Sequence, residues 1–165
     1  LWLQISWTIC LFGAELTYAG QNLRNFSFDK DTQNISRRYR DFISILIMSL
    51  IAKRFERNEP PYTAEEISEE HQIPIRLTNQ TLYQLQEINL IHEVVTDQKS
   101  EEIVYQPSMD LNQLNVAVVL DRLDTYGSEN FKIDKEVEFS DEWRILVESR
   151  EEYYKKASKV LLKEL

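Results

Sequence analysis

The sequence predicts a mainly α-helical protein with one small β-hairpin. Three observations carry this prediction. The first fourteen residues hold no charged side chain, later segments repeat apolar residues at helical spacing, and two β-rich runs flank a short polar stretch. We expect an N-terminal helix of the transmembrane type, a compact helical domain that contains the hairpin, and a C-terminal amphipathic helix.

Residues 1–22 have the composition of a membrane helix. A bilayer core about 30 Å thick needs about 20 helical residues to cross it. We therefore expect these residues to be the last transmembrane helix of a truncated polytopic protein, in contact with lipid. A buried core helix or the apolar region of a signal peptide is the alternative. The intramembrane or headgroup residues would be Trp2, Trp7, Glu15 and Tyr18.

Charge is unevenly distributed along a chain whose net charge is −9. Between Arg37 and Arg57 there are six basic residues and two acids, whereas Pro60 to Gly127 hold three basic residues and twelve acids. Basic residues just after an apolar span mark the cytoplasmic side of a membrane. The positive-inside residues would be Arg37, Arg38 and Arg40. We expect a location in the bacterial inner membrane, with residues after about 22 in the cytoplasm.

The middle of the chain predicts one domain over residues 36–127, after a polar loop over 23–35. Apolar residues trace one helical face from Ser36 to Arg57. Thr63 and Glu66 form a capping box, which predicts a helix that runs to about His71. After a turn at Ile73-Pro74, a second helix is expected over 75–89, and a hairpin over 90–96 and 101–106. This order of elements is typical of a winged helix-turn-helix domain.

Two further helices are predicted towards the C-terminus. Asp110 and Gln113 resemble a second capping box, so a helix is expected over 110–126, followed by Gly127. Residues 128–165 are expected to form a linker and an amphipathic helix that begins near Ser140. This helix has lysines near its C-terminal end, where the helix dipole favours cations.

The segment Tyr62 to Ile91 resembles the helix-turn-helix part of Rrf2-type winged-helix repressors. It does so in Tyr62-Thr63-Ala64, Ile67-Ser68, Ile73-Pro74, Leu77, Leu82, Leu85 and Leu90-Ile91. The face of its second helix is a candidate partner surface, formed by Arg76, Asn79, Gln80 and Tyr83. Asn79 and Gln80 could read adenine edges. The scarcity of cations nevertheless argues against nucleic acid as a partner, and favours a protein interaction module.

A second resemblance extends over most of the chain. The residues Leu3-Gln4-Ile5-Ser6-Trp7, Leu11-Phe12-Gly13-Ala14-Glu15-Leu16 and Ser36-Arg37-Arg38-Tyr39, with the winged-helix pattern, resemble the end of YihY/virulence factor BrkB family (ribonuclease BN-like) membrane proteins. This resemblance implies a polytopic inner-membrane protein whose other transmembrane helices lie upstream of Leu1. It also implies a cytoplasmic winged-helix domain.

Catalytic chemistry finds no support in the sequence. His71 and His92 are isolated, Cys10 is the single cysteine, and no glycine-rich phosphate loop or nucleophile motif occurs. The glutamates at 65, 66, 69 and 70 are interpreted as capping and surface charges. We therefore expect no enzyme activity, no catalytic or metal-binding residues and no cofactor.

These observations lead to three functional hypotheses. The first is a cytoplasmic regulatory or assembly domain of a membrane protein of the YihY/BrkB type, related to transport, which acts through a protein partner or a second copy of itself. The second is a DNA-binding winged-helix regulator. The third is a tRNA-processing activity, as the ribonuclease BN name of the resembling family suggests.

Overall fold

The computed structural model describes residues 2–32, 35–95, 102–129, 132 and 137–165, and over 18–32 it describes the backbone without the side chains. The chain divides into two compact units, Leu1–Ser36 and Arg37–Leu165. The chain is mainly helical, with one two-stranded antiparallel sheet.

The first unit is the helix α1, Trp2–Thr32. It corrects two expectations. Residues 23–32 continue the helix although a loop is predicted over 23–35, because the low helix propensity of Asn and Asp costs less than about 1 kcal/mol per residue. The transmembrane span is also wrong: in the described ranges, none of the helices combines the length and apolarity that crossing a membrane requires. Polar residues such as Gln4, Thr8 and Glu15 interrupt the apolar part of α1.

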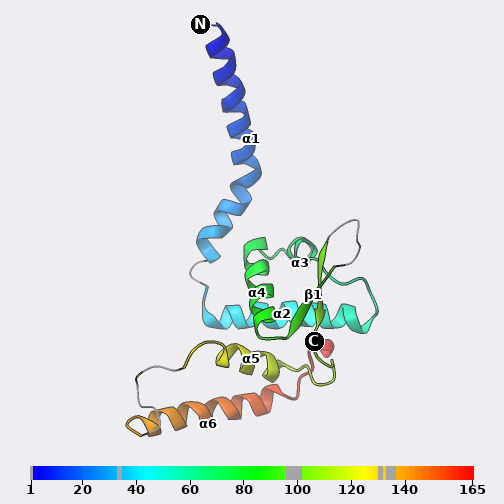
Figure 1. Cartoon of the computed structure of the whole chain (residues 1–165), viewed down its shortest axis with the longest axis vertical. Coiled ribbons are helices and arrows are strands. Elements are labelled where there is room, and N and C mark those ends of the chain that lie inside the picture. The colour runs from blue at the N-terminus through cyan, green and yellow to red at the C-terminus, as the bar shows by residue number, and fades with distance from the viewer. Residues whose placement is uncertain (1, 33–34, 96–101, 130–131, 133–136) are drawn as a thin grey trace. The chain divides into compact units, whose positions relative to one another are not determined.

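The second unit is built around α2, Arg37–Glu56, which confirms the helix predicted there. Its buried face carries Ile43, Ile47, Met48 and Ile51, all at most 3% exposed. Against α2 pack α4, β2, α5 and the C-terminal turn η1. Figure 1 shows α2 running between the helix-turn-helix and hairpin on one side and α5 with α6 on the other.

The helix-turn-helix consists of α3, Ala64–His71, and α4, Ile75–Glu87. The predicted capping box is confirmed, because the Glu66 amide donates to the Thr63 hydroxyl at 3.1 Å and the Thr63 amide donates to the Glu66 carboxylate at 3.1 Å. Gln72 ends α3 with a left-handed φ of 54°. Pro74 then precedes α4, since proline has no amide hydrogen to donate and favours the first turn of a helix.

The hairpin pairs β1, Ile91–Val95, with β2, Ile103–Pro107, in antiparallel register. Ile91 lies opposite Pro107, and Val95 lies opposite Ile103. The predicted turn at 97–100 lies outside the described residues. Helix, turn, helix and hairpin together are consistent with a winged helix.

The helix α5, Val116–Thr125, begins six residues later than predicted. Asn115 caps it, since its side chain accepts from the Val118 amide at 3.1 Å. Residues 111–113 form a turn after Asp110, and residues 114–116 then pair with the C-terminal segment through the bonds Val116 N–H to Val160 O at 3.0 Å and Leu162 N–H to Leu114 O at 3.1 Å. This pairing between segments distant in the sequence prevents the turn at Asp110 from continuing as a helix, so the helix begins only at Val116.

The chain ends with α6, Ser140–Ala157, and the 3₁₀ turn η1, Leu162–Glu164. The helices α5 and α6 lie side by side (Figure 1). None of the α6 residues is buried. Leu162 of η1 is fully buried against α2, so the last residues of the chain belong to the core of the second unit.

Candidate functional site

The exposed face of α4 brings together the four residues predicted as a partner surface. Arg76, Asn79, Gln80 and Tyr83 are all exposed, and Tyr83 is 63% exposed. Their spacing of three and four residues places them on adjacent turns of one helix face. The side chains of Asn79 and Gln80 make no hydrogen bond within the described part of the chain. Both amide groups can therefore bind a partner at no cost in internal hydrogen bonds.

The opposite face of α4 fixes the rotation of the helix about its axis. Leu77, Thr78, Thr81, Leu82 and Leu85 are buried there. The Thr78 hydroxyl donates to the Pro74 carbonyl at 3.3 Å, so this polar group is satisfied inside the core. Rotating α4 would expose these leucines, so the packing fixes which residues face outward.

The C-terminal end of α4 is held by Arg122 of α5. Its guanidinium donates to the carbonyl of Ile88 at 3.0 Å and to that of Asn89 at 2.8 Å. These carbonyls lie at the negative end of the helix dipole, where a cation is favourable. The role of Arg122 could not be predicted from the sequence, because no local pattern links this residue to Asn89, 33 residues earlier, at the end of α4.

We expect Arg122→Met to lower the free energy of unfolding by about 1–2 kcal/mol. Methionine retains an apolar stem but cannot form the two charge-assisted hydrogen bonds of Arg122. Each such bond typically contributes about 1–2 kcal/mol or less to net stability. Urea denaturation measures the change. The matched control is Arg144→Met on α6, whose side chain is 59% exposed and pairs with Asp141 and Glu148 of its own helix. Equal effects of the two substitutions would contradict the role given to Arg122.

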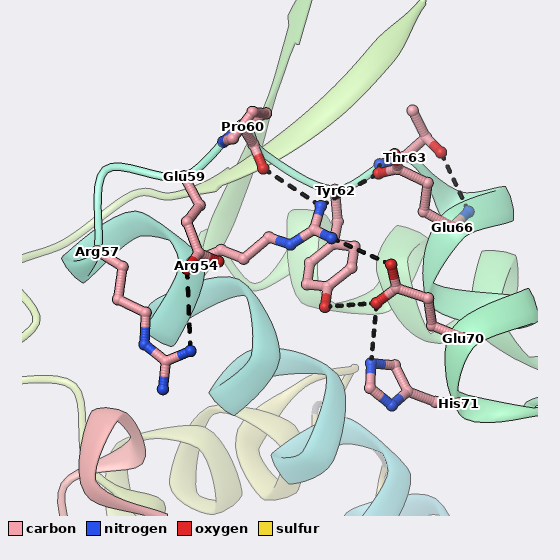
Figure 2. Close-up of polar contacts among 9 residues, drawn as sticks. All are labelled: Arg54, Arg57, Glu59, Pro60, Tyr62, Thr63, Glu66, Glu70 and His71. Carbon is pink, nitrogen blue, oxygen red and sulfur yellow. Dashed lines mark hydrogen bonds and ion pairs between the residues drawn. The ribbon is translucent and has the colours of Figure 1, made fainter.

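A polar cluster holds α3 on the C-terminal part of α2 (Figure 2). The Arg54 guanidinium contacts the Glu66 carboxylate at 3.3 Å and the Glu70 carboxylate at 3.2 Å, and donates to the Pro60 carbonyl at 3.3 Å. It also lies 3.3 Å from the centre of the Tyr62 ring. Arg54 therefore joins α2 both to the segment that leads into α3 and to α3 itself.

Tyr62 extends this cluster to the hairpin. Its hydroxyl donates to Glu70 at 2.9 Å, and its carbonyl accepts from the Tyr105 amide of β2 at 3.0 Å. Burial, with the hydrogen bond to Glu70 second, raises the pKa of Tyr62 above its ordinary value of 10.0. The hydroxyl therefore stays protonated and able to donate at neutral pH.

A second polar cluster surrounds Asp124 at the end of α5. Its carboxylate pairs with Arg37, lies 3.0 Å from the Arg150 guanidinium and accepts from the Tyr154 hydroxyl. Burial is the largest of the effects that raise the pKa of Tyr154. Arg37, predicted to mark a membrane boundary, instead links the start of α2 to α5, whereas Arg38 and Arg40 are exposed.

The sequences of α3 and α4 carry little positive charge. Glu69 of α3 and Glu87 of α4 are exposed, and Arg76 is the one basic residue in the α4 sequence. Near the hairpin, burial and then the charges of Glu93 and Glu65 raise the pKa of Tyr105. The α4 face thus offers hydrogen-bonding groups more than positive charge.

The other predicted site residues lie on α1. Trp2 and Trp7 are 85% and 68% exposed, and Glu15 is exposed. The side chain of Tyr18 lies outside the described residues. Because the span is not found, the membrane role predicted for these four residues loses its basis.

In the ranges that the structure describes, no group of three or more His, Cys, Asp or Glu side chains is placed to hold a metal ion. His71 lies 3.8 Å from Glu70 in the Arg54 cluster. His92 is an exposed residue of β1.

Solved structures of three bacterial proteins share this fold. T. potens IscR aligns with a TM-score of 0.52 at 16% identity, over 78% of this chain and 82% of its own. Staphylococcus aureus CymR gives 0.52 at 14% identity, over 76% and 93%. CymR of B. subtilis, described as the global cysteine regulator, gives 0.51 at 13% identity, over 79% and 93%. No family model and no curated protein matches the sequence.

These findings correct the main functional hypothesis. The resemblance to the YihY/BrkB family is wrong, because the structures that match are IscR and CymR proteins. The regulatory domain of a membrane protein is overturned with it, as are the membrane keywords and the ribonuclease name. Lipid contact through residues 1–22 and the inner-membrane location both depend on a span that is not found. The expectation that nucleic acid is not a partner is corrected as well, because the structures that share this fold are IscR and CymR proteins.

Proposed function

We propose that this protein is a DNA-binding winged-helix regulator that inserts the exposed face of α4 into the major groove. The observation that supports this most directly is the α4 face, where Arg76, Asn79, Gln80 and Tyr83 are exposed on a helix whose other side is packed in the core. The second helix of a helix-turn-helix is the element that enters the major groove. The likeness in fold to CymR, described as a regulator, supports the same assignment.

The Arg54 cluster and Arg122 serve this function by positioning. Arg54 holds α3 and the residues before it on α2, and Arg122 holds the end of α4. A recognition helix must be held rigidly, because displacement by about 1 Å spoils hydrogen bonds to base edges. Arg54 would thus fix the first helix of the helix-turn-helix, and Arg122 the end of the second.

The test is binding of the full chain to duplex DNA over a range of salt concentrations. We expect binding at low salt that weakens as salt rises, since each neutralised phosphate releases counterions. Arg76→Ala should weaken binding to all sequences and reduce the slope of log K against log salt by about one. Arg144→Ala, on the exposed surface of α6, should leave the slope unchanged. Folded protein that binds no duplex at low salt would refute the proposal.

A further inference from the structure

We propose that Asn79 and Gln80 read adenine bases, so that sequence selectivity comes from two side-chain amides rather than from phosphate attraction. This inference rests on the proposed function and specifies its target. It starts from the exposed pair of amides, which make no hydrogen bond in the described part of the chain.

The chemistry of the amide selects the base. A primary amide carries one acceptor oxygen and a donor nitrogen side by side. In the major groove adenine presents an N7 acceptor next to an N6 donor, whereas guanine presents two acceptors. Asn and Gln therefore form paired hydrogen bonds with adenine that guanine cannot match. Asn79 and Gln80 are consecutive, so they face adjacent parts of a groove.

The packing of α4 keeps both amides on the outer face. Thr78 and Thr81, which flank the pair, are buried. Arg122 fixes the C-terminal end of the helix through the Ile88 and Asn89 carbonyls. Neither amide can therefore turn inward without exposing the buried side of α4.

Electrostatics determines how much of the affinity the amides must supply. The α4 sequence has one basic residue, Arg76, and one acidic residue, Glu87, which is exposed, as is Glu69 of α3. Attraction to phosphates, which is independent of sequence, is therefore weak here. Binding to random DNA should therefore be confined to low salt, and the contrast between a matched and an unmatched site should depend on base contacts.

The experiment begins with selection of bound sequences from a random duplex library by the full chain. We expect adenines at fixed positions in the selected sites. Replacing each of these adenines with 7-deazaadenine, which pairs normally but lacks the N7 acceptor, should weaken binding roughly 5- to 100-fold at the positions that are read. In Asn79→Ala and in Gln80→Ala, the loss of affinity that 7-deazaadenine causes, called here the deaza penalty, should disappear at one position each.

The control is Gln113→Ala, which removes an exposed amide from the turn before α5. The Gln113→Ala variant should lose as much affinity as the parent chain when 7-deazaadenine replaces the adenines that are read. Thermal unfolding of all three variants should match that of the parent chain, since these side chains are exposed. Selected sites without fixed adenines, or a deaza penalty that survives in both α4 variants, would overturn the inference while the proposed function stands. If the folded chain selects no duplex at all, both fall.

Discussion

Leu162→Ala is expected to lower the free energy of unfolding of the second unit by about 3 kcal/mol. Leu162 is fully buried although it lies three residues before Leu165, in the turn η1 that packs on α2. Removing a buried leucine side chain costs roughly 2–5 kcal/mol, because transfer energy is lost and a cavity remains. The backbone holds the site rigid, since the Leu162 amide donates to the Leu114 carbonyl at 3.1 Å. A collapse that fills the cavity is therefore restricted.

Leu165→Ala provides the matched control, three residues further on. Leu165 is 54% exposed, so its truncation should change stability by no more than about 0.5 kcal/mol. Urea denaturation followed by circular dichroism measures both variants. If Leu162→Ala were as mild as Leu165→Ala, η1 would not be part of the core.

The elements with local sequence signals could be predicted closely. Thr63 and Glu66 specify the start of α3 within a few residues, and runs of residues that favour β-structure specify the two strands. The start of α5 could not be predicted, because it depends on the pairing of residues 114–116 with 160–162. No local pattern reports a partner segment nearly fifty residues away.

The candidate site also has a part that could be predicted from the sequence and a part that could not. The exposed residues of α4 follow from helical periodicity, since the buried leucines at 77, 82 and 85 define the opposite face. The roles of Arg54, Arg122 and Asp124 do not follow from helical periodicity, because their partners lie on other elements. The sequence also misled at α1, where uncharged residues suggested a span although Gln4, Thr8 and Glu15 keep the segment too polar.

Arg54→Ala should lower the free energy of unfolding by about 2–3 kcal/mol, the second-largest effect that we expect. The side chain of Arg54 is 20% exposed and binds two carboxylates and the Pro60 carbonyl while stacking on Tyr62. The substitution removes hydrogen bonds to the Pro60 carbonyl and to two carboxylates that are about half exposed, together with the packing of the guanidinium on the Tyr62 ring. Arg54→Lys should recover only part of the loss, because an ammonium group cannot fork between two carboxylates and stack on a ring.

Arg57→Ala on the same helix separates this effect from a general loss of charge. Arg57 is 66% exposed and lies 3.9 Å from Glu59, so its removal should change stability by less than about 0.5 kcal/mol. Because Arg54 also holds the segment that leads into α3, its loss should weaken DNA binding even where the protein is still folded. If Arg54→Ala were destabilising but bound DNA as tightly as the parent chain, the cluster would stabilise the fold without positioning the helix-turn-helix.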